Sequence, residues 1–390
     1  MADGLETKRQ DDRPRAAGDR GDAVAYRFGA AVIAVDAGDR ESARWLREFL
    51  TPWFTLETAR ETGPRVRMVA SAQRFAELAA RQLQTATRPV PCFSLDSALV
   101  SYPGWSEPDG TTVVADGEYG CYYRVQGAEV EIVARPDDRV ARIGLLRVVR
   151  ELATLDALAA PGMLDLHAAA FVTRGRAVLL VGGKRAGKTT LLAHVLASGQ
   201  AALLANDRLM VECGSLRATG VPTIVPVRED TERRFPALGR GLPRRAVLLH
   251  AGELALPEAV AWAAGARLVI SPTQFARQLG AATAASAPVG VIVFPEISSD
   301  ESMWSLQPVA RDEGSTRLVA GLYARGSGPR ERTVFQAAAG EAASAEAQIA
   351  LAQRVASAVP LVHCRLGPDA YRGHARAWLR ALPLGTPTST

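Results

Sequence analysis

Eight consecutive residues near the middle of the chain have the composition of a phosphate-binding loop. They are Gly182, Gly183, Lys184, Arg185, Ala186, Gly187, Lys188 and Thr189, and they follow the pattern G-x-x-x-x-G-K-[ST]. Glycines let the backbone wrap closely around an anion and aim consecutive N–H groups at it. The pattern predicts that this loop, together with Thr190, holds the phosphates of ATP or a similar nucleotide.

Two side chains at the end of the loop suit nucleotide chemistry. The Lys188 ammonium can reach the β- and γ-phosphates, and the Thr189 hydroxyl can bind Mg²⁺. The flanking sequence also fits, because an apolar run at 177–181 predicts a strand and an amphipathic helix follows the loop and ends at Gly199. The alternative is a glycine-rich turn that precedes a helix and binds nothing.

The next candidates are Asn206 and Asp207. They follow the apolar run 203–205, which predicts a strand that delivers Asp207 to its carboxyl end, where open α/β sheets bind ligands. An acid there can bind Mg²⁺ or accept the proton of an attacking hydroxyl. The alternative is an Asn-Asp turn between two strands.

Three other kinds of residue could contribute to a nucleotide site. His167 lies on a strand expected at 164–172, where a lone histidine among apolar residues is more often structural. Glu296 follows the apolar run 291–294 and is either a ligand of metal or substrate or an exposed acid. Arginines suit the charge that develops on phosphoryl oxygens, although an arginine-rich segment can also be a solvated loop. The arginines of the densest basic segment are Arg228, Arg233, Arg234, Arg240, Arg244 and Arg245. Lys184 and Arg185 either touch phosphate or face water, and we expect His194 to be structural.

Composition narrows the classes of function. The chain has 390 residues, 48% hydrophobic and 22% charged, as expected of a globular protein. The net charge of +5 is mild and the basic residues are interspersed with acids, which argues against a nucleic-acid partner. No apolar stretch approaches the roughly 20 residues of a membrane span. Four cysteines without CxxC spacing predict reduced thiols in a cytoplasmic protein.

Lysine is rare in this chain. Among 46 basic residues the only lysines are Lys8, Lys184 and Lys188. None of them fits an NKxD motif, so a GTPase that reads guanine through that motif is excluded. Arginine would not easily replace Lys188, because a phosphate loop needs a compact ammonium on a flexible stem.

The chain divides into an α/β catalytic part and a smaller part before it. Residues 1–22 are charged and expected to be disordered. Residues 23–160 predict a smaller α+β domain, which could bind the molecule that accepts the phosphate. A helix predicted at 140–160 has apolar residues on one face. Residues 161–385 predict a P-loop domain with a mixed sheet and flanking helices, and residues 386–390 a flexible tail. Further strands are predicted at 65–70, 202–206, 208–213, 266–271, 289–294 and 361–366, and helices at 72–83, from 271–272 onward and within 334–359.

The order of these elements resembles the HPr kinase/phosphorylase catalytic domain, with a histidine strand, a hairpin, a P-loop, a helix and a strand that ends at an acidic pair. More closely, the chain resembles HPr-kinase-related proteins of bacterial natural-product clusters, including those that phosphorylate lasso peptides. The matching stretches are LDLHAAAFVTRGRAVLLVGGKRAGKTTLLAHVLASG and ALLANDRLMVE, with weaker matches at SPTQFARQLG, APVGVIVFPEIS and VPLVHCRLGPDA. The resemblance covers about 160–385.

This resemblance implies a kinase that uses ATP and Mg²⁺. His167 falls on the family's strand histidine, and Asp207 falls on the second member of its Asp-Asp pair, while Asn206 replaces the first member. An amide oxygen can ligate a metal but cannot act as a general base. The candidate catalytic residues are therefore Asp207, His167 and Lys188, and the candidate metal ligands are Thr189, Asp207 and Asn206.

Two functions remain open at this point. The first is transfer of the γ-phosphate to a hydroxyl, either a Ser or Thr of a peptide or a small metabolite, in bacterial natural-product or peptide modification. The second is a nucleotide-binding switch with a degenerate kinase site and no phosphoacceptor, which Asn206 favours. An oligomer is compatible with both functions.

Overall fold

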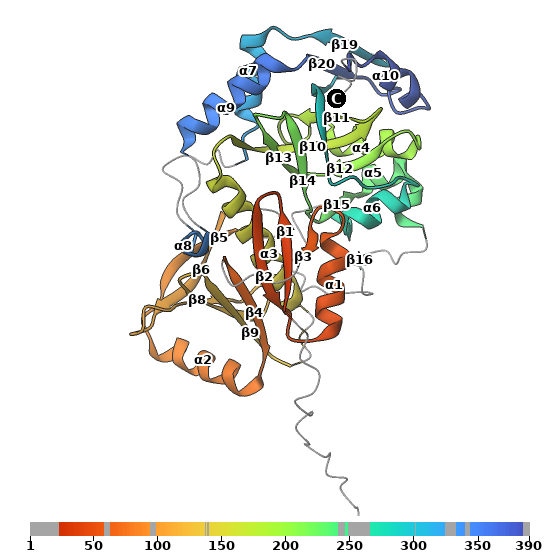
Figure 1. Ribbon diagram of the computed structural model, residues 1–390. Coiled ribbons are helices and arrows are strands. Elements are labelled where there is room, and N and C mark those ends of the chain that lie inside the picture. Colours follow the sequence, from red (N-terminus) through yellow and green to blue (C-terminus); the bar gives the residue numbers. More distant parts are fainter. Residues whose placement is uncertain are drawn as a thin grey trace, which may run out of the picture.

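The computed structural model describes residues 23–57, 63–93, 99–136, 138, 140–240, 246–248, 266–300, 302–323, 333–339 and 344–384. Within these ranges the chain is a mixed α/β protein with two large mixed sheets, one small sheet and flanking helices (Figure 1). The expectations for residues 1–22 and 386–390 lie outside the described residues.

The first large sheet takes its strands from the amino-terminal third of the chain. Its nine strands run in the order β3-β1-β2-β4-β9-β8-β7-β6-β5. They are β1 (Val24–Phe28), β2 (Ala31–Asp36), β3 (Thr55–Glu57), β4 (Arg65–Ala70), β5 (Arg88–Phe93), β6 (Leu99–Ser106), β7 (Thr112–Asp116), β8 (Cys121–Gln126) and β9 (Glu129–Ala134). Helices α1 (Arg40–Leu50) and α2 (Ala72–Gln84) pack on it. The strand predicted at 65–70 and the helix predicted at 72–83 are confirmed.

The second large sheet carries the glycine-rich loop that the sequence predicts to bind phosphate. Its strands run β11-β10-β13-β14-β18-β20-β19, β12 pairs with β10, and β11 also pairs with β18. The strands are β10 (Met163–Thr173), β11 (Arg176–Val181), β12 (Ala202–Ala205), β13 (Arg208–Glu212), β14 (Arg217–Val221), β18 (Ser286–Ile297), β19 (Trp304–Pro308) and β20 (Leu361–Leu366). The strands expected around 164–172, 177–181, 202–206, 208–213, 289–294 and 361–366 are confirmed.

Helices cover both faces of this second sheet. On one face the apolar side chains of the sheet pack with α4 (Lys188–Ala197) and α10 (Ala375–Ala381), and on the other with α7 (Arg311–Ala320) and α9 (Ala345–Ala358) (Figure 1). The helical prediction for 334–359 is confirmed as α8 (Gln336–Ala339) followed by α9. The side chains of His167 and Asp165 share the α4 face, because alternate residues of β10 contribute to the opposite core.

A third, small sheet contributes side chains to the same apolar core as α4. Its order is β15-β17-β16, from β15 (Val225–Arg228), β16 (Ala246–Leu248) and β17 (Ala266–Ile270). Helix α5 (Glu229–Arg234) and the 3₁₀ helix η1 (Pro236–Gly239) follow β15. Helix α6 (Pro272–Gln278) begins as predicted, since the Ser271 side chain accepts a hydrogen bond from the Gln274 N–H and Pro272 occupies the first turn.

Helix α3 (Ala141–Ala159) lies between the two large sheets and corrects one prediction. The apolar spacing indicated a single buried face, but every residue except Asp156 and Ala159 is buried. The helix contacts strands of the first sheet on one side and β10 of the second on the other. Its polar residues Arg147, Arg150 and Glu151 are buried as well, and we call these three residues the charged seam.

A second contact joins the two sheets near the candidate site. The Trp53 indole Nε1–H donates to the Leu204 carbonyl oxygen over 2.6 Å. Gly220 on β14 lies against both groups, because a Cβ there would be 1.9 Å from the Leu204 oxygen and 2.6 Å from the Trp53 nitrogen. Only glycine leaves room for this contact, which supports the strand that leads to Asp207.

We therefore expect Gly220→Ala to destabilise the protein. The new methyl group collides with a backbone carbonyl that cannot rotate away, so the free energy of unfolding should fall by about 1–3 kcal/mol. Urea denaturation measures the change, and Gly214→Ala is the matched control, since no atom lies within 4 Å of a Cβ at that position. Equal stability of the two variants would contradict the close contact at Gly220.

Candidate functional site

The glycine-rich loop connects β11 to α4, as predicted. Gly187 precedes the first residue of α4 with φ +93°, a conformation that favours glycine, and its carbonyl accepts from the Leu191 N–H at 2.9 Å. Lys184 and Arg185 are exposed at the tip. The backbone therefore turns from a buried strand directly into a helix N-terminus, which is the geometry that binds phosphate.

Lys188 lies against its own loop. Its Nζ donates to the Gly182 carbonyl at 2.6 Å and to the Gly183 carbonyl at 3.1 Å, and the residue is 8% exposed. Burial lowers the pKa of Lys188, and the charge of Asp207 acts in the opposite direction. The ammonium thus lies within electrostatic range of Asp207 at the mouth of the loop.

The sheet brings His167 and Asp207 together. Strands β12 and β13 both pair antiparallel with β10. Asn206 and Asp207 lie between these two strands, next to the point where Arg208 pairs with His167. The His167 Nε2 and Asp207 Oδ1 atoms are 2.9 Å apart, and each side chain is about one-third exposed, at 35% and 37%. Because Ala168 pairs with Val181 at the end of β11, the His167–Asp207 pair and the start of the loop lie at one level of the sheet.

Charged groups from three elements keep Asp207 ionised. Burial would raise the pKa of this carboxyl, but the hydrogen bond and charge of His167 together with the charges of Lys188 and Arg150 hold it below its ordinary value. Tyr323 also lies within electrostatic range of it. An ionised carboxylate beside a phosphate loop can bind a cation or accept a proton from a hydroxyl.

Asn206 holds a neighbouring loop. Its Nδ2 donates to the Ile224 carbonyl at 3.1 Å, and its Oδ1 accepts from the Thr223 hydroxyl at 2.9 Å. The residue is 6% exposed. One lone pair of Oδ1 is thus occupied by a protein hydrogen bond, and the amide anchors the turn between β14 and β15 behind the site.

A buried ion pair supports β13, the strand that begins directly after Asp207. The Arg208 guanidinium binds Asp165 through two bonds, of 3.0 Å from Nε and 2.7 Å from Nη2, and stacks 3.9 Å from the Tyr323 ring centre. The Tyr323 N–H donates to the Asp165 carbonyl. This bidentate pair locks β13 to β10 next to His167 and thereby orients the candidate site.

The sequence did not single out Arg150, which α3 contributes to this region. Arg150 is 3% exposed, and the charged and polar groups near it include Tyr323, Arg208, Tyr119 and Glu151. Its charge lowers the pKa of Asp207. A polar residue within an apolar helical pattern was the available signal, but an exposed arginine gives the same pattern.

Glu151, beside Arg150, provides a test of this charged seam. Burial raises the pKa of Glu151 to about 7, although the charges of Arg147 and Arg150 and the nearby Thr333 side chain act in the opposite direction. The folded protein therefore binds this proton more tightly than the unfolded chain does. The residue destabilises the fold progressively as the pH rises from its ordinary pKa of 4.5 through 7.

We expect Glu151→Gln, which cannot ionise, to gain stability relative to the wild type as the pH rises. The gain between about pH 5.5 and about pH 8 should be about 2 kcal/mol. Denaturant unfolding at both pH values measures it, with the exposed Glu48→Gln on α1 as the control. A difference between Glu151→Gln and the wild type that is the same at both pH values would refute the raised pKa.

Glu296 and the candidate arginines among the described residues come from other elements than the His167–Asp207 pair does. The Glu296 carboxylate lies 2.7 Å from the His363 Nε2 on β20, and the residues of that face pack toward α7 and α9. Arg228, Arg233 and Arg234 are all exposed, and the Arg234 guanidinium stacks 5.0 Å over the Tyr371 ring. Arg244 and Arg245 lie outside the described residues.

His194 is buried, as expected of a structural residue. It packs against the rings of Phe235 and Tyr371, with ring centres 6.4 and 5.7 Å away. Burial, with a smaller effect from His374, lowers its pKa to about 4, so the imidazole is neutral at pH 7. It thus fills the core under the loop helix.

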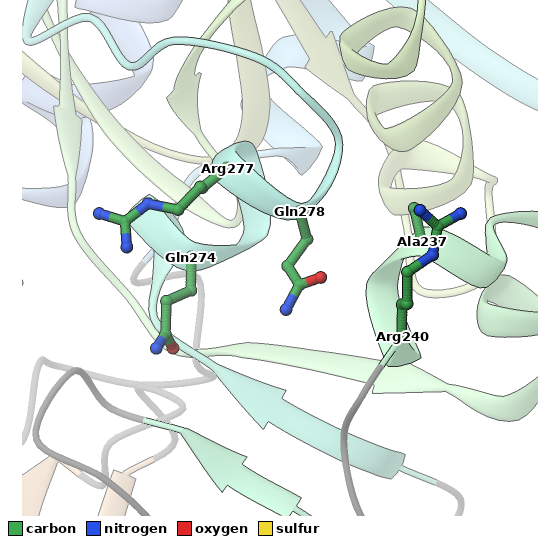
Figure 2. Close-up of a pocket in the computed structure, with 5 residues that line it drawn as sticks. All are labelled: Ala237, Arg240, Gln274, Arg277 and Gln278. Carbon is green, nitrogen blue, oxygen red and sulfur yellow. The ribbon is translucent and has the colours of Figure 1, made fainter.

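One cleft of about 340 Å³ lies apart from the loop, between η1 and α6. It is lined by Ala237, Arg240, Gln274, Arg277 and Gln278. Figure 2 shows the Arg240 and Arg277 guanidinium groups on opposite sides of Gln278, with Arg277 extending away from Gln278 and Arg240 lying beside Ala237. They do not converge on one ligand, and Arg240 is the one candidate residue from the sequence that lines this cleft.

Comparisons with known proteins leave the family unassigned. No protein-family model and no curated protein matches this chain.

The four cysteines are buried and unpaired, as predicted. None of the helices in the described part of the chain is both long and apolar enough to cross a membrane.

Proposed function

We propose that this protein is an ATP- and Mg²⁺-dependent kinase that transfers the γ-phosphate to a hydroxyl. The observation that carries the proposal is the placement of the His167–Asp207 pair, 2.9 Å apart, at the same level of the sheet as the start of the phosphate loop. A terminal phosphate held by the loop and a hydroxyl held by Asp207 would then be neighbours. The resemblance to HPr-kinase-related proteins supports the same reaction.

Each group has a distinct role in the proposed transfer. Asp207 accepts the proton of the acceptor hydroxyl, whose oxygen forms a bond to the γ-phosphorus as the bond to the β-phosphate oxygen breaks. The His167 contact uses one Asp207 oxygen and leaves the other for this proton. Lys188 and the N–H groups at the start of α4 stabilise the negative charge that develops on the phosphates.

The residues present fit a magnesium ion shared with the nucleotide. Among the described residues no three His, Cys, Asp or Glu side chains gather as a metal site. Mg²⁺ in such enzymes needs only one or two protein groups, because phosphate oxygens and water complete its shell. Asp207, Thr189 and the second lone pair of the Asn206 amide oxygen would be these groups. The ion would neutralise phosphate charge.

The acceptor class follows from the resemblance and from the proton chemistry. Asp207 suits a neutral hydroxyl, so the acceptor is a Ser or Thr of a peptide or a small hydroxylated metabolite. The setting would be bacterial natural-product or peptide modification, in the cytoplasm. The amino-terminal unit, joined to the site through α3 and Trp53, would bind this acceptor.

One observation favours a nucleotide-binding switch instead. Asn206 holds Thr223 and Ile224, so a single carboxylate remains for both metal binding and proton transfer. A protein of this kind would bind ATP and change shape without phosphorylating an acceptor.

A binding and transfer experiment tests the proposal. Lys188→Ala should weaken ATP binding by about 10- to 100-fold, because it removes a charged phosphate contact, and should abolish label transfer. The exposed Arg311→Ala on α7 is the control and should bind ATP like the wild type. The label donor is γ-labelled ATP, and the acceptors are peptides and metabolites encoded or made by neighbouring genes.

The outcomes separate the two functions. Transfer of label to an acceptor supports the kinase. ATP binding without transfer to any acceptor supports the switch. Unchanged ATP affinity in Lys188→Ala would overturn both proposals.

A further inference from the structure

An exposed apolar side chain lies directly beside the phosphate loop. Ile297, the last residue of β18, is 60% exposed and belongs with Leu56 and Leu83 to the large hydrophobic residues exposed among the described residues. Its Cγ1 lies 3.3 Å from where a Cβ on Gly187 would be. Single exposed hydrophobic residues are common, so the position of Ile297 is the informative feature.

Tyr371 and Arg234 extend this surface, and Leu366, which is 1% exposed, supports it from the core. The Tyr371 hydroxyl and the Leu366 Cδ1 lie 3.4 and 3.5 Å from the same point beside Gly187. The Arg234 guanidinium stacks 5.0 Å over the Tyr371 ring. We call Ile297, Tyr371 and Arg234 the apolar shelf, since they offer an exposed apolar side chain and a half-buried ring with a cation at the edge.

The sheet topology places this shelf opposite the candidate catalytic pair. Strand β11 has β10 on one edge and β18 on the other, because both strands pair with the same residues of β11. His167 and Asp207 lie on the β10 side, and Ile297 lies on the β18 side. A nucleotide whose phosphates occupy the loop, with its terminal phosphate toward Asp207, directs its nucleoside toward the shelf.

We infer that the apolar shelf binds the nucleoside of a purine nucleoside triphosphate, with the base against Ile297 and Tyr371. The inference rests on the proposed function, since it takes the phosphates to occupy the loop. An apolar surface packs on the flat face of a base and does not read its edge. The shelf therefore binds adenine and guanine alike, and it contributes affinity that inorganic triphosphate does not gain.

Binding of three probes to the full-length protein tests the shelf. Dissociation constants are measured for ATP, GTP and inorganic triphosphate, each with Mg²⁺, by calorimetry. In the wild type, ATP and GTP should bind within about threefold of each other and at least about tenfold more tightly than triphosphate, as expected for a buried apolar contact. Ile297→Ala should weaken both nucleotides by about fivefold and leave triphosphate unchanged.

The control is Leu83→Ala, which removes an exposed hydrophobic side chain from α2, far from the loop in the sequence. It should leave all three affinities unchanged, and thermal melting confirms that both variants fold. If Ile297→Ala weakens triphosphate and nucleotide binding equally, Ile297 supports the loop and does not contact the base. If nucleotide binding is unchanged, the shelf does not bind the nucleoside. Either result overturns this inference and leaves the kinase proposal standing. A wild type that binds none of the probes overturns both.

Discussion

Replacing Asp207 by asparagine should lower phosphoryl transfer by about 10²- to 10⁴-fold while ATP still binds, because the amide cannot accept a proton. Asparagine has the same shape and can keep a hydrogen bond to His167, which lies 2.9 Å from the carboxylate. The rate is measured by single-turnover transfer from γ-labelled ATP at saturating nucleotide. Loss of rate at retained affinity is the signature of a group that acts in the chemical step.

Two further variants sharpen this test of the base. Asp312→Asn changes an exposed acid at the start of α7 and should leave the rate unchanged. Asp207→Ala removes both oxygens, so it should be at least as slow as Asp207→Asn. Label transfer that survives in Asp207→Ala at the wild-type rate would eliminate Asp207 as the base.

Replacing Arg147 by methionine should lower the free energy of unfolding by about 3–5 kcal/mol, because it leaves a buried carboxylate without its counter-charge. Arg147 Nη2 and Asp116 Oδ2 are 2.9 Å apart, and both side chains are inaccessible to solvent. The rings of Tyr102, Tyr119 and Tyr123 surround the guanidinium at 4.8 to 5.3 Å. Urea denaturation measures the loss.

A double-mutant cycle separates the buried pair from general damage to α3. Asp116→Asn combined with Arg147→Met should cost less than the sum of the two single changes, because no unpaired charge remains. The control is Arg372→Met, which breaks a surface pair with Asp369 at an arginine that is 80% exposed. That loss should stay below about 1 kcal/mol. An additive cycle would contradict coupling between Arg147 and Asp116.

Sequence patterns predicted the structure best where an element depends only on residues that are neighbours in the chain. The phosphate loop, the strand before it and the helix after it are local features, because glycine positions and apolar spacing act on neighbouring residues. The helix start at Ser271 is equally local, since one side chain satisfies the N–H of Gln274 in the first turn. Such features are determined by short-range chemistry and appear in the structure as predicted.

The helix α3 shows where periodicity is insufficient. The apolar spacing at 140–160 indicated one buried face, yet the helix also buries Arg147, Arg150 and Glu151. A second layer of protein covers those charges, which pair with residues remote in the chain such as Asp116. Hydrophobic spacing cannot show that a charged face is buried, because the partners come from another element.

The sequence by itself therefore determined that a glycine-rich loop joins a strand to a helix and that Asp207 follows an apolar strand. Only the tertiary structure brought His167 within 2.9 Å of Asp207, engaged Asn206 with Thr223, and placed Ile297 beside Gly187. The physical reason is that these contacts depend on strand register and on which strands are neighbours. Register and neighbours are set by packing of the whole sheet, not by any short stretch of the chain.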